Sequence, residues 1–158
     1  MTVKEYLGQA YRLSLKIDSN MQEIAYLRDV ATRGTSRRLA TQQSGTEGRS
    51  FMENTVVKLV DLERAVEADQ RRLALARQQV AAVIGYLPEG SCRKLLTLRY
   101  VDCREWLEVA VNLGLCWERM QRLHSKALAT VKAYLLLRRG RDSSYAAIPT
   151  AMGGGSHG

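Results

Sequence analysis

Five side chains near position 120 have the chemistry needed to read base pairs. Residues 117–137 are predicted to form a helix whose side away from the core carries Trp117, Glu118, Gln121, Arg122 and Ser125. In the major groove of DNA, arginine can pair with guanine, glutamine can pair with adenine, and glutamate can accept from cytosine. A solvated surface can have similar residues, but a tryptophan among arginine and glutamine is an uncommon choice for one. We therefore predict that these five side chains contact base edges.

The residues just before this helix have the spacing of a helix-turn-helix. Ala110, Gly114 and Met120 stand where that motif needs a small residue, a turn glycine and an apolar residue that points into the core. Because the turn requires a positive φ, we predict one at Gly114. An ordinary helical hairpin with a glycine hinge has the same spacing, so the sequence leaves that alternative open. The further apolar residues that a small three-helix core requires are Leu107, Leu113, Leu115 and Leu123.

Basic residues are concentrated in the same part of the chain. The net charge is +8, and residues 89–139 contain ten Lys and Arg against five Asp and Glu. Such an excess attracts polyanions, nucleic acid among them. His124 is interpreted as a packing residue or a phosphate contact. The side chains predicted to contact DNA phosphates, and so to fix the position of the protein on the duplex, are Arg104, Arg119, Lys126 and Lys132.

About a quarter of the chain resembles region 4 of sigma-70-type factors, the module that grips the promoter −35 element. The resemblance covers LPEGSCRKLLTLRYVDCREWLEVAVNLGLCWERMQRLHSKAL. It departs from the family at Cys116, where a capping Ser is common, and at Cys103, where a turn Gly is usual. No sigma region 2 is visible, so promoter melting by this chain alone is not expected. The matching pieces are Leu87-Pro88-Glu89, Leu98-Arg99-Tyr100, Trp106, Val109-Ala110, Leu113-Gly114, His124 and Ala127-Leu128.

The whole arrangement is also similar to phage and prophage regulators of Gram-positive bacteria, of the ArpU and RinA late-regulator type. These join an N-terminal helical hairpin, with a phrase like VVKLVDLE (Val56 to Glu63), to a sigma-region-4-like end. The resemblance implies DNA-binding control of phage gene transcription in the cytoplasm of a bacterial host. It implies double-stranded DNA as the partner, and it is consistent with RNA polymerase as a second one.

The N-terminal part has two apolar stripes with helical spacing. The first runs from Val3 to Ile24 on a helix that we expect to end near Arg33-Gly34. The second steps by three and four from Leu59 to Leu87, and Asp69 is its only polar member. The stripes could face each other in an antiparallel hairpin, or the second could form a homo-oligomeric coiled coil. A homodimer through the hairpin is also consistent with the sequence. Other expected core residues are Leu7, Ala10, Ile17, Met21, Met52 and Val56.

The sequence therefore predicts an all-α protein with two modules. Residues 1–87 form a coiled-coil-like helical hairpin with a mobile connector at 34–50, which has three glycines and no apolar periodicity. Gly85 and Pro88 mark the boundary. Residues 88–139 form a three-helix module with helices at about 88–101, 105–113 and 117–137, and residues 140–158 form a disordered tail.

Other classes of function have little support in the sequence. Three cysteines without a CxxC pair and two histidines give no metal site, and we expect no cofactor. No phosphate-binding glycine loop or hydrolase motif is present, so we do not expect an enzyme. The sequence has no run of 18 apolar residues, so we expect no membrane span and a soluble cytoplasmic protein. The alternative to a transcription regulator is a phage assembly or DNA-packaging subunit, similar in style to a small terminase, that oligomerises through its coiled coil.

Overall fold

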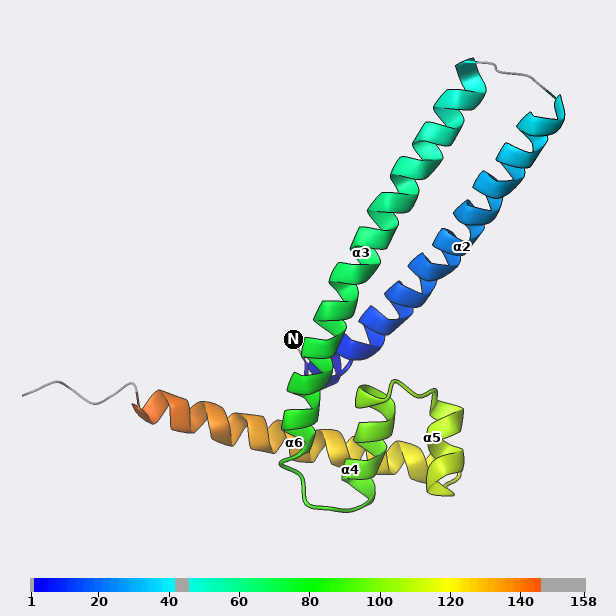
Figure 1. Ribbon diagram of the computed structural model, residues 1–158. Coiled ribbons are helices and arrows are strands. Elements are labelled where there is room, and N and C mark those ends of the chain that lie inside the picture. Colours follow the sequence, from blue (N-terminus) through cyan, green and yellow to red (C-terminus); the bar gives the residue numbers. More distant parts are fainter. Residues whose placement is uncertain (1, 42–45, 146–158) are drawn as a thin grey trace, which may run out of the picture.

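The computed structural model describes residues 2–41 and 46–145, and every regular element in these two ranges is a helix. The predicted all-α fold is confirmed. Figure 1 shows α2 and α3 as a long pair that projects from a cluster formed by the other helices. In chain order the helices are α1 (Val3–Leu7), α2 (Gln9–Thr41), α3 (Thr46–Ile84), α4 (Ser91–Leu96), the π-helical turn η1 (Thr97–Val101), α5 (Trp106–Leu113) and α6 (Trp117–Tyr145).

A short helix, α1, precedes the long helix α2. Thr2 and Glu5 form a capping box, in which the Glu5 N–H donates to Thr2 Oγ1 and the Thr2 N–H donates to Glu5 Oε2. These two bonds satisfy backbone donors that the first turn leaves free. The sequence predicts one helix here, but Gly8 separates α1 from α2. The Gly8 N–H still donates to Lys4 O at 2.9 Å, so the interruption is small.

The predicted connector at 34–50 is largely helical, which corrects the sequence analysis. Helix α2 continues to Thr41 and α3 begins at Thr46. Extending a formed helix adds one hydrogen bond for each residue fixed, so it needs no apolar stripe. Gly34 serves a close contact, because a Cβ there would lie 3.3 Å from Met52 Sδ. The predicted mobility concerns residues 42–45 at most, and these lie outside the described residues.

Helices α2 and α3 pack against each other within one chain. Ile17, Ile24 and Val66 are the buried residues of this contact, and Leu59, Leu62 and Leu73 pack against them. Of the two candidate partners for the second stripe, the first helix is therefore the one seen. Two expected core residues are instead half-exposed, Met21 at 51% and Val56 at 49%. At both places the preceding polar residue takes the position on the seam, since Asn20 is half-buried and Thr55 is buried.

Asp69, the polar member of the second stripe, is buried in the hairpin with a cation beside it. Its side chain is 2% exposed, and Lys16 Nζ lies 2.7 Å from Oδ2. Arg72 Nη1 lies 3.2 Å from Oδ1. The hydrogen bond and the positive charge of Lys16 hold the pKa of Asp69 below its usual value. A buried carboxylate with a cation on the other helix favours one register of α2 against α3.

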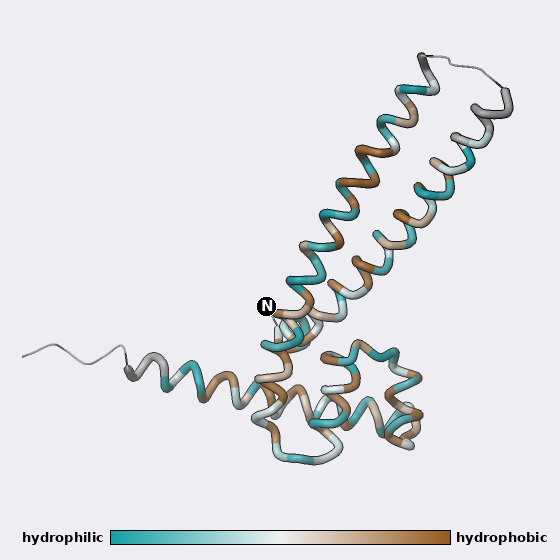
Figure 2. Tube along the Cα trace, viewed as in Figure 1, coloured by the Kyte–Doolittle hydropathy of each residue, from teal (hydrophilic) through white to brown (hydrophobic). Residues whose placement is uncertain are grey.

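One apolar core joins the base of the hairpin to the C-terminal helices. Leu7 and Ala127, which are far apart in the sequence, belong to the same cluster, and α1 packs on α6. Figure 2 shows hydrophobic residues where the long pair meets the other helices. The boundary at 87/88 therefore marks a change in charge and not a break in packing. The buried members are Leu7, Val80, Val83, Ile84, Leu87, Leu95, Leu96, Tyr100, Val109, Met120, Ala127 and Val131.

The C-terminal helices differ from their predicted bounds at two places. The first begins at Ser91, three residues after Pro88, and continues through η1 to Val101. The last extends to Tyr145, so the predicted disordered tail is helical from 140 to 145. The first turns of α6 are already anchored in the core. Each residue added to this formed helix gains one hydrogen bond, so the free-energy cost of the extension is small. Residues 146–158 lie outside the described residues.

Candidate nucleic-acid interface

The turn between α5 and α6 has the geometry that the helix-turn-helix spacing predicts. Gly114 has φ 64° and ψ 32°, in the left-handed region, which confirms the predicted positive φ. The Leu115 N–H donates to Ala110 O at 3.1 Å, and the Gly114 N–H donates to Val111 O at 3.2 Å. No atom lies within 4 Å of a Cβ placed on Gly114. The position therefore needs glycine for its dihedral angle and not for space.

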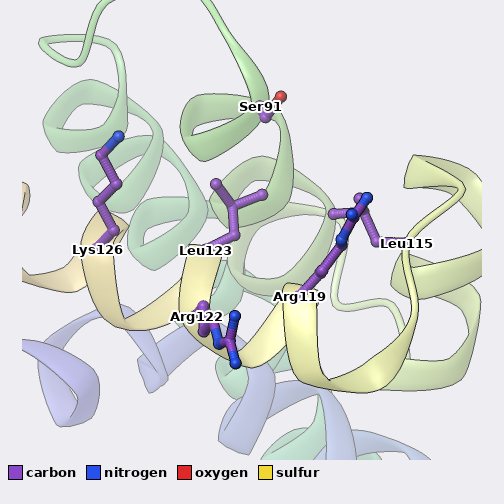
Figure 3. A pocket seen from close by; sticks show the side chains of 6 residues that line it. All are labelled: Ser91, Leu115, Arg119, Arg122, Leu123 and Lys126. Atoms are coloured by element: carbon purple, nitrogen blue, oxygen red, sulfur yellow. The ribbon is translucent and has the colours of Figure 1, made fainter.

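The first turns of α6 have a buried side and an exposed side. Met120 is fully buried, and His124 is 6% exposed. The five residues predicted to contact bases are all exposed, and Trp117 is 55% exposed. Figure 3 shows Arg119 and Arg122 extending from the same stretch of α6. The structure thus brings the predicted base-reading residues onto one accessible surface, and what they contact stays a prediction.

A shallow groove lies between the start of α4 and α6. Its volume is about 340 Å³, and Leu115 and Leu123 form its apolar part. Three cationic side chains, Arg119, Arg122 and Lys126, line it together with Ser91 of α4 (Figure 3). Arg122, predicted to read a base, therefore lies beside two residues predicted to contact phosphate. An anionic backbone running along this groove would meet all three cations.

Most described cations of the hairpin have a carboxylate partner. Lys58 pairs with Glu23, Arg71 pairs with Glu67, and five further ion pairs involve other hairpin cations, whereas Arg12, Arg64 and Arg77 have none in the described ranges. Among the residues that the structure describes, the cations of α4 and of the first half of α6 have no carboxylate within 4 Å. A free cation keeps its full attraction for an external anion. These cations are Arg93, Lys94, Arg119, Arg122, Lys126 and Lys132.

The other two predicted phosphate contacts lie outside the groove. Arg104 is exposed just before α5, and its Nη1 lies 3.9 Å from Glu108 Oε1, so a carboxylate partly neutralises it. Lys132 is exposed on α6 about 9 Å along the axis from Lys126. The structure therefore groups two of the four predicted phosphate contacts, Arg119 and Lys126, and separates the others from them.

His124 is a packing residue, one of its two predicted roles. Its Nε2 lies 2.7 Å from the Tyr100 hydroxyl, and its ring meets Trp106 edge-on with centroids 4.7 Å apart. Burial disfavours the charged ring, and the nearby cations of Lys4 and Arg99 add to this, so the pKa of His124 falls to about 4. Burial also raises the pKa of Tyr100, so a neutral ring and a neutral hydroxyl share this hydrogen bond, and the tautomer of His124 sets which one donates.

The residue that links the hairpin to the motif is Arg99, and sequence reasoning gave it no role. Its guanidinium lies between two rings, 4.1 Å from the Tyr11 centroid and 4.6 Å from the Trp106 centroid. Its Nη1 donates to Arg104 O at 2.8 Å, and the Tyr11 hydroxyl donates to Glu105 Oε1 at 2.7 Å. These contacts hold α2 against the start of α5. Only the family resemblance, through Leu98-Arg99-Tyr100, marked this position.

Cys103 adopts a positive φ of 56°, the only one among the described non-glycine residues. It stands where the resemblance to sigma region 4 expects a turn glycine. Glycine adopts this left-handed backbone conformation at little cost in free energy, whereas Cys103 adopts it with a Cβ and at a higher cost.

Comparison of the chain with protein-family models, with curated proteins and with solved structures finds no match in any of the three. The residues and their geometry therefore carry the functional argument.

Two further findings concern the described part of the chain. None of its helices is long and apolar enough to cross a membrane. Within residues 2–41 and 46–145, no group of three His, Cys, Asp or Glu side chains could hold a metal ion.

Proposed function

We propose that the protein is a sequence-specific DNA-binding transcription regulator that uses α5, the Gly114 turn and α6 as a helix-turn-helix. The observation that carries this proposal is the surface of α6. Its first turns present Trp117, Glu118, Gln121 and Arg122 to solvent, next to a groove of cations that lack ion-pair partners among the described residues. Direct readout needs such a combination, because bases are read by polar side chains and position is fixed by cations on phosphates.

In this mechanism the first turns of α6 enter the major groove of double-stranded DNA. Gln121 and Arg122 contact base edges, and Trp117, Glu118 and Ser125 add hydrogen bonds or contact area. Arg119 and Lys126 bind phosphates of the strand that passes the α4–α6 groove, while Arg104 and Lys132 extend the positive surface to either side. The hairpin is fixed to the motif by the shared core and Arg99, so its direction relative to the DNA is set.

The biological setting of this proposal comes from the resemblance to sigma region 4 and to phage regulators. It places the protein in the cytoplasm of a bacterial host, acting on phage or prophage promoters, with RNA polymerase as a candidate second partner. A homodimer through the hairpin would let the two subunits each read one half-site.

A selection of bound duplexes from a random-sequence library, followed by mobility shifts at several salt concentrations, tests the proposal. We expect an enriched site and an affinity that falls steeply as salt rises, because phosphate contacts release counterions. Binding without an enriched site would show that the protein binds DNA without sequence specificity. No salt-sensitive binding at all would contradict the proposal.

Arg122 and Lys132 should respond differently to substitution. Arg122→Ala should lose about 1–3 kcal/mol on the selected site and relax the preference at one base pair, because a bidentate contact to guanine is lost. Lys132→Ala should weaken all duplexes alike and lower the salt slope by about one phosphate contact. Both variants are titrated against the selected and a scrambled duplex. Equal losses on both duplexes for Arg122→Ala would remove its base-reading role.

A second candidate function, a phage assembly or DNA-packaging subunit, is favoured by the surface of the hairpin. Large apolar side chains remain exposed on it, including Phe51, Val57 and Leu75 at 56–60%. Exposed apolar side chains do not stabilise a helical pair that is surrounded by solvent, so they are consistent with a contact to another subunit. Stoichiometry separates the two functions, since a large ring indicates packaging, whereas a monomer or dimer indicates regulation.

A further inference from the structure

Helix α5 has an apolar face that the core does not use. The sequence predicts Leu107 in the three-helix core, but its side chain is 76% exposed, and Val111 one turn later is 74% exposed. The core residue of this helix is Val109, which is fully buried and lies on the other side. A single exposed apolar residue is ordinary, but these two are adjacent on one side of a helix of eight residues.

The second half of α6 also has an exposed apolar side. Leu136 is 60% exposed and Leu137 is 69% exposed. Ala129 and Ala133 are exposed as well, and their spacing places them on the same side of the helix. Figure 1 shows this half of α6 projecting from the helix cluster, at the opposite side from α5.

The charges around these two surfaces are opposite. Residues 102–116 contain three carboxylates, Asp102, Glu105 and Glu108, against one arginine. Residues 132–142, around the end of α6, contain four cations against one carboxylate, Asp142. Two α5 faces brought together would place like charges side by side, and so would two α6 ends. The contact that charge favours is between α5 and the end of α6.

These two surfaces cannot meet within one molecule. Helix α5 packs beside His124 of α6 through Trp106, and Leu136 lies twelve residues further along α6. At the standard helical rise this is about 18 Å along a continuous helix that leads away from α5.

We propose that the end of α6 (Leu136, Leu137) of one molecule docks on the exposed face of α5 (Leu107, Val111) of a second copy. The contact is heterologous, because each copy uses a different surface, so repetition gives a ring or an open chain. It is distinct from a homodimer through the hairpin, and it does not depend on DNA binding.

The test uses two double variants of the full chain and their mixture. Leu107→Gln/Val111→Gln removes the α5 face, and Leu136→Gln/Leu137→Gln removes the α6 end. Sedimentation velocity at low salt should show the wild type associating as its concentration rises, with weaker association at high salt. Each variant alone should stay at the monomer mass of 17.7 kDa. Their mixture should form a 1:1 dimer that grows no further, since one intact surface remains on each partner.

The hairpin provides the control for this experiment. Val57→Gln/Leu75→Gln removes exposed apolar side chains of the same kind from α3 and should leave association unchanged. All replaced side chains are more than half exposed, so circular dichroism should show unaltered folding. A mixture that stays monomeric, a wild type that associates only when a DNA duplex is added, or a loss of association in the hairpin variant alone would each overturn the proposal.

Discussion

At the scale of single residues, two positions depart from what their local environment would favour. Cys103 has a positive φ that L-residues adopt at a cost, and His124 is buried with a pKa lowered to about 4. Both lie beside the linkage between the hairpin and the helix-turn-helix. Each departure changes stability in a way that a matched substitution can measure.

Cys103→Gly should stabilise the protein by up to about 1 kcal/mol. Relief of the left-handed dihedral gains about 1–2 kcal/mol, and the extra freedom of glycine in the unfolded chain offsets part of it. Urea unfolding followed by tryptophan fluorescence measures the change. Cys103→Ala is the control, because alanine keeps the strained dihedral and should give no such gain. Equal effects of the two variants would show that the thiol, and not the backbone, matters.

His124 should make the protein sensitive to mild acid. Its folded pKa of about 4 lies below the ordinary value of 6.5, so the unfolded chain takes up the proton first as pH falls. The stability that the neutral, hydrogen-bonded ring contributes should therefore be lost progressively from about pH 6.5 down to about pH 4. Unfolding midpoints of wild type and His124→Gln across this range check it, and the decline should be shallower in the variant. Parallel declines would assign the acid sensitivity to other groups.

At the scale of elements, the hairpin is held in register by a charge buried in a mostly apolar seam. Asp69 and Lys16 come from different helices, and the Lys16 ammonium is the only partner of Asp69 Oδ2 among the described residues. A slip of α2 along α3 by one turn would leave Asp69 with Arg72 of its own helix but without the Lys16 ammonium, which is costly for a buried carboxylate. The apolar stripes by themselves would tolerate such a slip.

Asp69→Asn should reduce the stability of the hairpin at neutral pH and remove part of its acid sensitivity. The pKa of Asp69 is lowered, so its contribution is present above the ordinary value of 3.8 and is lost as pH falls through the lowered value. Helical signal at 222 nm, followed in urea at neutral pH and below pH 4, measures both effects. Glu67→Gln, which alters an exposed pair on the same helix, is the control and should change little. Equal acid sensitivity in Asp69→Asn and wild type would contradict this role.

At the scale of the whole molecule, the hairpin base and the helix-turn-helix share one core, so we expect them to unfold together. Gly114→Val should destabilise the protein by about 1–2 kcal/mol through its left-handed dihedral. Helical signal, which is dominated by the hairpin, and tryptophan fluorescence, which reports the C-terminal helices, should shift by the same amount. Gly140→Ala, in a helical and open site, should be neutral or slightly stabilising. A shift in fluorescence alone would restore the two independent modules that the sequence predicts.

Local signals in the sequence determined that the chain is helical and that a turn lies at Gly114, and they left two candidate partners for the second stripe. The helices and the turn depend on residues a few positions apart, whose spacing on a helix is fixed by its geometry. Tertiary structure alone decided the rest, including the burial of Asp69 against Lys16, the stacking of Arg99 between two rings and the exposure of Leu107. These features depend on which faces of distant helices meet. The helical period of the sequence does not show which faces meet, because an apolar stripe shows that one face of a helix is apolar but not which other helix covers that face.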